Sequence, residues 1–293
     1  MYEFFNAVGL AGCDQNAFMT MENVLEINPS VKFVASNNTK DDNKVELSLY
    51  LGENLGIRAC GFEDRNGNFI RESYFPFFES DRVTIKEENL DFDRKRNSDE
   101  VLLCSEVKEF GFLLFSFVQN LYEVTDGASL ELTDEYKMLY RGVSLTGLSH
   151  NGLILLPKGE DNDKELNNIE AIRRKLKNDL FAGKDGAYEQ LTLTEMQIYS
   201  KIDKRVKKNG VYGVVENTFK PRTIDLDIYR VVGTIEDIRE VKTEVNDQIV
   251  YLLDLNCCGM DFIVAINSGD LVGIPKEGRR FKGEVWLQSR ILV

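Results

Sequence analysis

The longest nearly uninterrupted apolar run of this chain spans residues 111–118, and the polar residues Gln119 and Asn120 follow it. A helix that crosses a bilayer needs about 20 apolar residues, so this run is too short to span a membrane. A short apolar run that contains aromatic residues, begins at glycine and ends at polar residues is typical of a strand buried on both faces, although a buried helix segment remains an alternative. We expect this run at the centre of a core.

Ahead of this run, apolar residues recur first at helical and then at alternating spacing. Residues 4–8 and 16–26 predict two short helices, and Pro29 stops the second. Alternation of apolar and polar residues then predicts four strands, at residues 31–34, 45–51, 55–60 and 69–75. The sequence Asp64-Arg65-Asn66-Gly67 predicts a tight turn before the last of them, because Asn-Gly favours positive φ angles.

The remainder of the first half combines a charged stretch with further strands. Residues 87–100 are charged and poorly periodic, so we expect a surface loop there. Residues 101–104 predict the strand before the central run. Residues 142–148 and 152–157 flank Ser149-His150-Asn151 and predict a hairpin after it.

From residue 158 to residue 210 the apolar spacing is helical. One stripe predicts a first helix, and it consists of Leu166, Ile169, Ile172, Leu176 and Leu180. Thr194 is expected to cap a second helix, whose apolar face carries Met196, Tyr199, Ile202 and Val206. The two helices predict a helical hairpin.

The last segment returns to strand patterns. Four apolar stretches predict strands, at residues 229–235, 250–255, 262–266 and 281–287, and a short apolar turn at residues 271–274 precedes the last. This order resembles an oligonucleotide/oligosaccharide-binding (OB) barrel. The sequence therefore predicts an α+β protein with three parts: an antiparallel, sheet-rich N-terminal domain (1–157), a helical hairpin with a linker (158–220) and a small C-terminal OB-like β-barrel (221–293).

The charge balance limits the partners that this chain can bind. The 36 basic and 49 acidic residues give a net charge of −13, which repels polyanions and argues against a nucleic-acid partner or an anionic membrane surface. The N-terminus has an acidic residue early and no basic region, so we expect no secretory signal and a cytoplasmic protein.

The five cysteines predict no covalent or metal framework. Their number is odd and no C-x-x-C occurs, so we expect neither disulfides nor zinc. Adjacent Cys257 and Cys258 border an apolar strand pattern, and we interpret them as buried structural thiols.

Linear catalytic motifs are absent from the sequence. There is no Walker A sequence, no G-x-G-x-x-G, no G-x-S-x-G and no H-E-x-x-H. The single histidine, His150, lies in a predicted turn, where we expect a solvated side chain. Two acidic clusters, near residues 63–68 and 160–165, do not complete a calcium loop and are interpreted as a turn and a helix N-terminus. We assign no catalytic residue, no cofactor and no metal, and we lean against an enzyme.

Basic residues gather on the helical hairpin against the average charge of the chain. On the first helix they follow one another in sequence, and they are Arg173, Arg174, Lys175 and Lys177. On the second helix spacings of three and four gather them into one exposed basic stripe, and they are Lys201, Lys204, Arg205 and Lys208. This face could dock an acidic partner, a phosphate or RNA, but a solvated helix face with the same charges is the alternative. Interleaved aromatic residues, which base stacking would need, are missing.

A second candidate site is the rim where the central strand leaves the core. Gln119, Asn120 and Tyr122 lie there in sequence. If the N-terminal domain has a binding site, we expect it at this rim.

Three stretches carry a resemblance to a known family. They are residues 2–10 (YEFFNAVGL), the run 111–118 with the QNLY that follows, and LTGL at 145–148 through GLILLP at 152–157. The chain resembles an uncharacterised bacterial family of cytoplasmic proteins of about this length, defined as a domain of unknown function. The resemblance covers most of the first half. It implies a bacterial intracellular protein but no activity, cofactor or catalytic residue.

Three hypotheses for function follow. The first is a non-catalytic binding or scaffolding protein that engages another protein or a second copy of itself. The second is an enzyme whose site is built from carboxylates and tyrosine at the junction of the sheet and the barrel. The third is RNA or phosphate binding through the basic face of the hairpin. A pocket with convergent polar groups and perturbed carboxylates would favour the second, and a flat apolar patch would favour the first.

Overall fold

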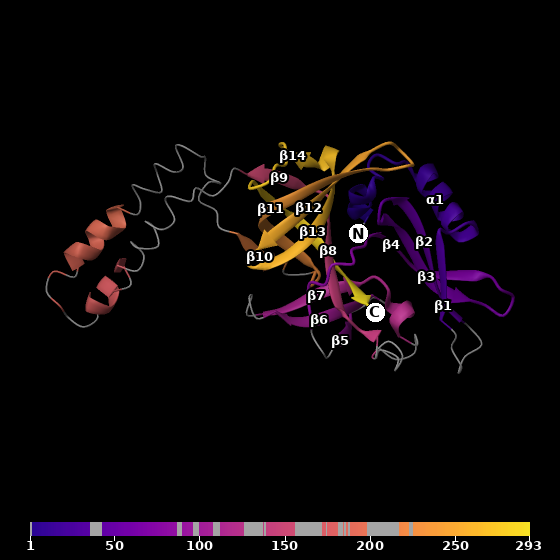
Figure 1. Cartoon of the computed structure of the whole chain (residues 1–293), viewed down its shortest axis with the longest axis horizontal. Coiled ribbons are helices and arrows are strands. Elements are labelled where there is room, and N and C mark those ends of the chain that lie inside the picture. The colour runs from indigo at the N-terminus through magenta and orange to yellow at the C-terminus, as the bar shows by residue number, and fades with distance from the viewer. Residues whose placement is uncertain are drawn as a thin grey trace. The chain divides into compact units, whose positions relative to one another are not determined.

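The chain divides into two compact units in a computed structural model (Figure 1). One unit comprises Met1–Ile154 and Asn217–Val293, and the other comprises Leu155–Glu216. The structure describes residues 2–35, 43–86, 90–95, 100–107, 112–125, 137, 139–155, 172–173, 175–180, 184, 186, 188–197, 217–222 and 225–293. No helix in these ranges is long and apolar enough to cross a membrane.

The first unit begins with two helices and a four-stranded antiparallel sheet. The 3₁₀ helix η1 (Tyr2–Val8) and the α-helix α1 (Gln15–Ile27) confirm the two predicted helices, and the Asp14 side chain caps α1 by accepting from the Ala17 N–H at 2.8 Å. The sheet has the order β1 (Val31–Ala35), β2 (Asn43–Gly52), β3 (Leu55–Glu63) and β4 (Phe69–Phe78). The turn between β3 and β4 is also confirmed, since Asp64 accepts from the N–H groups of Asn66 and Asn68.

The second sheet of this unit has eleven strands and draws on both halves of the sequence. Its strands are β5 (Asp91–Arg94), β6 (Val101–Val107), β7 (Phe112–Val118), β8 (Gly142–Ser149), β9 (Gly152–Leu155), β10 (Thr218–Pro221), β11 (Ile228–Lys242), β12 (Ile249–Cys257), β13 (Met260–Asn267), β14 (Leu271–Val272) and β15 (Arg280–Leu292). The main path runs β10-β11-β12-β13-β8-β15-β7-β6-β5, and β9 pairs with β14 and β15. Two short helices, α2 (Leu121–Val124) and η3 (Ser268–Asp270), follow β7 and β13.

Strands from before residue 157 and after residue 221, which the sequence assigns to separate domains, belong to one sheet. β8 pairs in parallel with β13 and antiparallel with β15, and β11 pairs with both β12 and β15. The α+β content is as expected, but an OB-like barrel formed by residues 221–293 is not confirmed, because β8 lies between two strands of that segment. Every residue of β8 is buried, which suits a strand with neighbours on both edges.

Three local predictions are wrong. β8 and β9 do not form a hairpin with each other, because both pair with β15. The expected loop at 87–100 contains the short strand β5, whose partner is β6. His150 is packed rather than solvated, with its ring 4.9 Å from the ring of Phe4.

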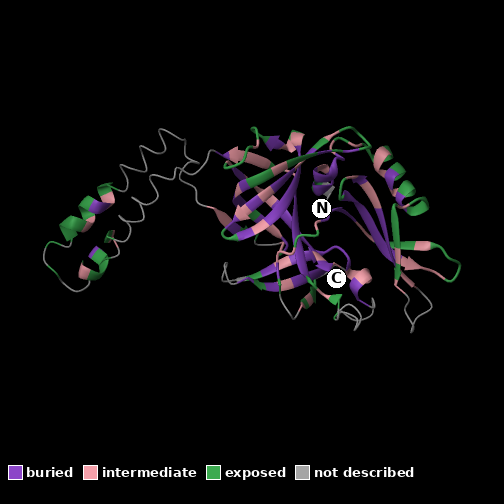
Figure 2. Ribbon diagram, in the orientation of Figure 1, coloured by how far each residue is buried: buried purple, intermediate pink, exposed green. Residues whose placement is uncertain are grey.

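The prediction for the central apolar run is confirmed for Phe112–Val118. The Phe117 ring lies 4.7 Å from the Phe75 ring and 5.1 Å from the Trp286 ring, in a cluster that also contains η1, α1 and the four-stranded sheet. Leu114 and Val118 belong to a second cluster, which contains residues of β8, β11–β13 and β15. From Leu114 onward, side chains of both faces of the strand therefore pack into a core, whereas Leu113 is exposed. Figure 2 shows the burial of the described residues.

All five cysteines are free. Cys257 is buried as expected, but Cys258 is exposed, which corrects its prediction as a buried thiol. Cys258 has a φ of 55°, in the turn between β12 and β13, and this turn conformation directs its side chain away from the core.

In the second unit, residues 172–173, 175–180 and 188–197 are helical where the structure describes them. Thr194 lies inside this helical stretch and its hydroxyl donates to the Gln190 carbonyl at 2.8 Å, so the prediction that it caps the helix is wrong. Of the predicted stripe, Leu176 is buried and Ile172 and Leu180 are exposed.

A buried ion cluster joins the two sheets of the first unit. The Arg58 guanidinium on β3 donates to Glu79 Oε1 at 2.6 Å, to Ser48 Oγ at 2.8 Å and to the Gln119 carbonyl oxygen at 2.9 Å. Gln119 donates in turn to the Phe78 carbonyl and to Gln288 Oε1 on β15. The contacts satisfy a cation that is only 6% exposed.

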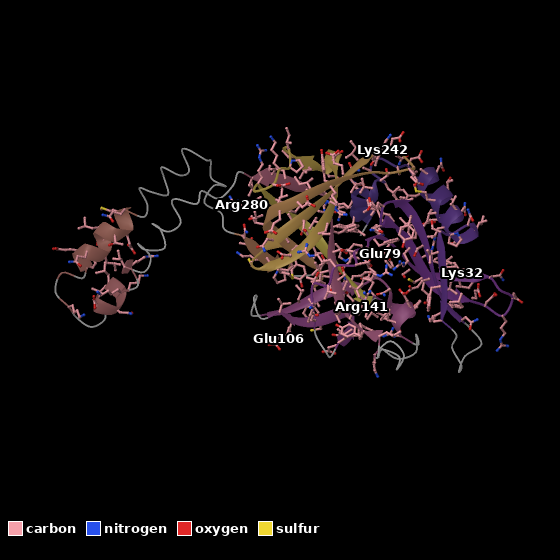
Figure 3. All side chains as sticks on the ribbon, viewed as in Figure 1. Lys32, Glu79, Glu106, Arg141, Lys242 and Arg280 are labelled. Atoms are coloured by element: carbon pink, nitrogen blue, oxygen red, sulfur yellow. The ribbon has the colours of Figure 1, made fainter. Side chains whose placement is uncertain are left out.

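Glu79→Gln should destabilise the protein by about 3–5 kcal/mol, because it leaves the buried Arg58 cation without its carboxylate. Lys242→Gln is the control, because the Lys242–Asp247 pair is exposed and such pairs contribute about 1 kcal/mol or less. Figure 3 labels both positions. Urea unfolding of both variants measures the difference, and equal losses would show that Glu79 does not balance the charge of Arg58.

Candidate functional site

A cavity of about 240 Å³ lies between the four-stranded sheet and the β6–β7 strands. Its polar lining residues are Glu46, Cys60, Glu72, Ser73, Glu100 and Gln119, and its apolar and aromatic lining residues are Tyr74, Phe75, Val101, Phe117, Val118, Leu121 and Tyr122. An apolar recess with a few convergent polar groups is the usual form of a small-molecule site, and this one is somewhat smaller than the usual range of about 300–1,000 Å³.

Strand register brings three of the polar residues into one row. Glu46 on β2 pairs with Cys60 on β3, and Cys60 pairs with Ser73 on β4. Residues directly opposite one another in an antiparallel sheet project from the same face, so a carboxyl, a thiol and a hydroxyl line the cavity side by side.

A β-bulge adds a fourth polar residue. The register of β3 and β4 shifts between Cys60 and Gly61, which leaves Glu72 as the extra residue on β4. A Cβ on Gly61 would lie 2.0 Å from the Ile70 carbonyl oxygen, so the bulge depends on glycine here. Glu72 accepts hydrogen bonds from the Tyr122 hydroxyl at 2.8 Å and from Lys44 Nζ at 2.7 Å.

Among the carboxyl groups that line the cavity, that of Glu46 has the most strongly shifted pKa. It is 5% exposed and accepts a hydrogen bond from the Tyr122 backbone N–H at 2.7 Å. Burial raises the pKa of Glu46 from its usual 4.5 to about 7, although Arg58 and the Tyr122 N–H oppose the rise. Charged and titratable groups face it from β3, α2 and β15, and they are Arg58, Cys60, Tyr122, Glu123 and Arg290.

The pKa values of Cys60, Glu72 and Tyr122, which line the same cavity, are shifted by different causes. Burial and the nearby Glu46 raise the pKa of the Cys60 thiol, so it is protonated and a poor nucleophile at neutral pH. Burial opposes ionisation of Glu72, but hydrogen bonds from Lys44 and Tyr122 lower its pKa on balance. Burial and the bond to Glu72 raise the pKa of the Tyr122 hydroxyl. Two carboxyls in one cavity therefore have pKa values shifted in opposite directions, an arrangement that can separate acid and base roles.

The structure brings together part of the rim predicted from the sequence. Gln119 and Tyr122 line the cavity, whereas Asn120 is buried and exchanges two 3.0 Å hydrogen bonds with the backbone of Ile291. Among the described residues, Gln119 Oε1 has no hydrogen-bond partner.

The predicted basic face is described only at its beginning. Arg173 pairs with Glu195 at 3.3 Å, and Lys175 and Lys177 are exposed. Arg174, Lys201, Lys204, Arg205 and Lys208 lie outside the described residues, so this face stays a prediction.

Sequence reasoning missed Glu46, Cys60 and Ser73. In the stretch 45–51, Glu46 and Ser48 alternate with apolar residues, which reads as a strand with its polar face in water. The second sheet covers that face, so both residues are buried. The only sequence signal was that Glu46 and Arg58 are both charged residues inside the alternating patterns of two successive predicted strands.

The described carboxylates do not form a metal centre. Within the described ranges, no group of three or more His, Cys, Asp or Glu side chains is arranged to hold a metal ion. Glu72 is instead paired with Lys44, and Glu100 is paired with Lys95 at 3.1 Å.

Glu46→Gln should stabilise the protein at high pH and leave its stability little changed at low pH. A folded-state pKa above the unfolded value means that the native protein loses stability as pH rises from about 4.5 to about 7, by up to roughly 3 kcal/mol. Glutamine stays neutral and avoids this loss. Urea unfolding at about pH 5 and about pH 8 tests the effect, with Glu277→Gln at an exposed position as the control. A pH-independent difference would contradict the burial effect on Glu46.

Comparison with known proteins gives a family but no function. A family model described as "Domain of unknown function, E. rectale Gene description (DUF3881)" matches residues 5–289, and its description fits the bacterial origin that the resemblance implied. No curated protein and no solved structure matches the chain. Because the match covers nearly the whole sequence, the chain belongs to the DUF3881 family of domains of unknown function.

Proposed function

We propose that this protein binds a small molecule in the cavity between β4 and β7. The observation that carries the proposal is a partly open recess lined by aromatic and aliphatic residues together with Glu46, Glu72 and Gln119. Apolar walls supply affinity and convergent polar groups supply orientation. The proposal keeps binding from the first hypothesis, with a small molecule as the ligand. From the second it keeps carboxylates and tyrosine, although the cavity lies within residues 46–122 and not at the predicted junction of sheet and barrel.

Catalysis on the bound molecule is an extension of the same proposal. A carboxyl with a pKa near 7 exchanges protons efficiently at neutral pH, and Glu46 has such a value. Glu72, held ionised by Lys44, could orient the substrate. Binding is common to both roles, so the test of binding comes first.

A protein partner or a second copy of this chain is a second candidate, favoured by one observation in the helical unit. Its described helical residues expose large apolar side chains, with Tyr188 at 70%, Leu193 at 61% and Met196 at 63%. Sedimentation velocity over a range of concentrations tests self-association directly, and a monomer throughout would exclude the second copy.

A cytoplasmic location also stays part of the proposal. The five free thiols support it, because secreted proteins commonly oxidise theirs to disulfides.

Leu121→Trp should abolish small-molecule binding by filling the cavity that Leu121 lines. A fragment library that contains cationic, neutral and anionic compounds is screened against the full chain by amide shift changes in NMR spectra. We expect hits that shift the amides of Ser73, Gln119 and Tyr122 and that are lost in the variant.

The matched control is Leu226→Trp, which adds the same side chain at an exposed position. It should keep every hit. If no fragment shifts the cavity amides of the native chain, or if both variants behave alike, the proposal is wrong.

A further inference from the structure

The polar side chains of the cavity are rich in hydrogen-bond acceptors and poor in cations. Three carboxyl groups line it, those of Glu46, Glu72 and Glu100, and its described lining includes no lysine, arginine or histidine. Lys44 and Lys95 already pair with Glu72 and Glu100 from outside the cavity. Glu46 has no ion pair among the described residues, so it is the carboxyl that remains open to a cation.

A second lining residue, Gln119, also carries an acceptor that lacks a donor among the described residues. Gln119 is only 1% exposed, and its Nε2 donates to the Phe78 carbonyl and to Gln288 Oε1. These acceptors fix the orientation of the amide, which leaves its Oε1 without a partner in the described part of the chain. Buried acceptors are normally satisfied, so a donor from a bound molecule would complete this one.

Aromatic rings also line the cavity, those of Tyr74, Phe75, Phe117 and Tyr122. The faces of aromatic rings attract organic cations. Lys44 already lies over the Tyr122 ring at 5.1 Å and Arg71 over the Tyr74 ring at 5.5 Å, so Phe75 and Phe117 are the lining rings with no such contact among the described residues. The net charge of −13 also raises the local concentration of cations around the protein.

We infer that the cavity is a site for a small organic cation, a protonated amine carried on a small apolar group, with Glu46 as its counter-ion and Gln119 Oε1 as a second acceptor. This inference rests on the proposed small-molecule function and names its ligand class. A divalent metal ion is a poorer fit, because the described carboxylates are not arranged as a ligand set.

Three probes of one shape and different charge test the inference: benzylammonium, benzyl alcohol and benzoate. Each is titrated into the full chain at about pH 8, where the amine is protonated, and the amides of Ser73, Gln119 and Tyr122 report binding. We expect benzylammonium to bind at least about tenfold more tightly than benzyl alcohol, because it forms a charge-assisted hydrogen bond, and benzoate to bind most weakly.

Glu46→Gln should weaken benzylammonium binding by about tenfold or more and change benzyl alcohol binding by less than about twofold. Glu277→Gln makes the same change of charge at an exposed position and should alter neither. Unfolding curves of both variants confirm that each is folded under the titration conditions.

The possible failures are distinguishable. If benzyl alcohol or benzoate binds as tightly as benzylammonium, or if Mg²⁺ shifts the same amides at lower concentration, the cation inference is wrong and the small-molecule function stands. If Glu46→Gln weakens all three probes equally, Glu46 is not the counter-ion and the inference is likewise wrong. If no probe shifts these amides at millimolar concentration, and the fragment screen also yields no hit, both proposals are wrong.

Discussion

The burial of Arg58 is the constraint on which the junction of the two sheets depends. A guanidinium excluded from water must find an acceptor for each of its donors, and no single strand can supply them all. Ser48 comes from β2, Glu79 from the end of β4, and the Gln119 carbonyl from the end of β7. Because these acceptors belong to both sheets, the guanidinium fixes their separation at this point.

Two buried carboxyls near this cation have pKa values shifted in opposite directions. Glu79 accepts from Arg58, Arg290 and the Tyr50 hydroxyl, and despite its burial these groups lower its pKa. Glu46 faces the same guanidinium but forms no ion pair with any described residue, and its burial raises its pKa. Both cations of the cluster form ion pairs with Glu79, whereas Glu46, which lines the cavity, forms no ion pair with a described residue.

The parts of the fold that could be predicted are those encoded locally. The apolar run of β7, the capping residue Asp14 and the Asn-Gly turn each fix their own element through nearby residues. The β8–β9 hairpin prediction was wrong because its residues do not encode where β15, far away in sequence, will pair. The site was half predicted for the same reason: Gln119 and Tyr122 follow a recognisable strand, whereas Glu46 becomes a cavity residue only when the second sheet covers its face.

A carboxyl whose pKa is raised to about 7 reconciles ligand recognition with stability. A permanently ionised Glu46 would add an uncompensated buried charge, whose desolvation opposes folding. With its raised pKa, the carboxyl can hold a proton when the cavity is empty and still hydrogen-bond the Tyr122 N–H. An incoming ammonium group would supply the missing positive charge, so Glu46 would release its proton to solvent as the ion pair forms. The free energy lost by burying the carboxylate would then be offset by the ligand rather than by the fold, which is the arrangement expected of a residue whose charged form serves binding alone.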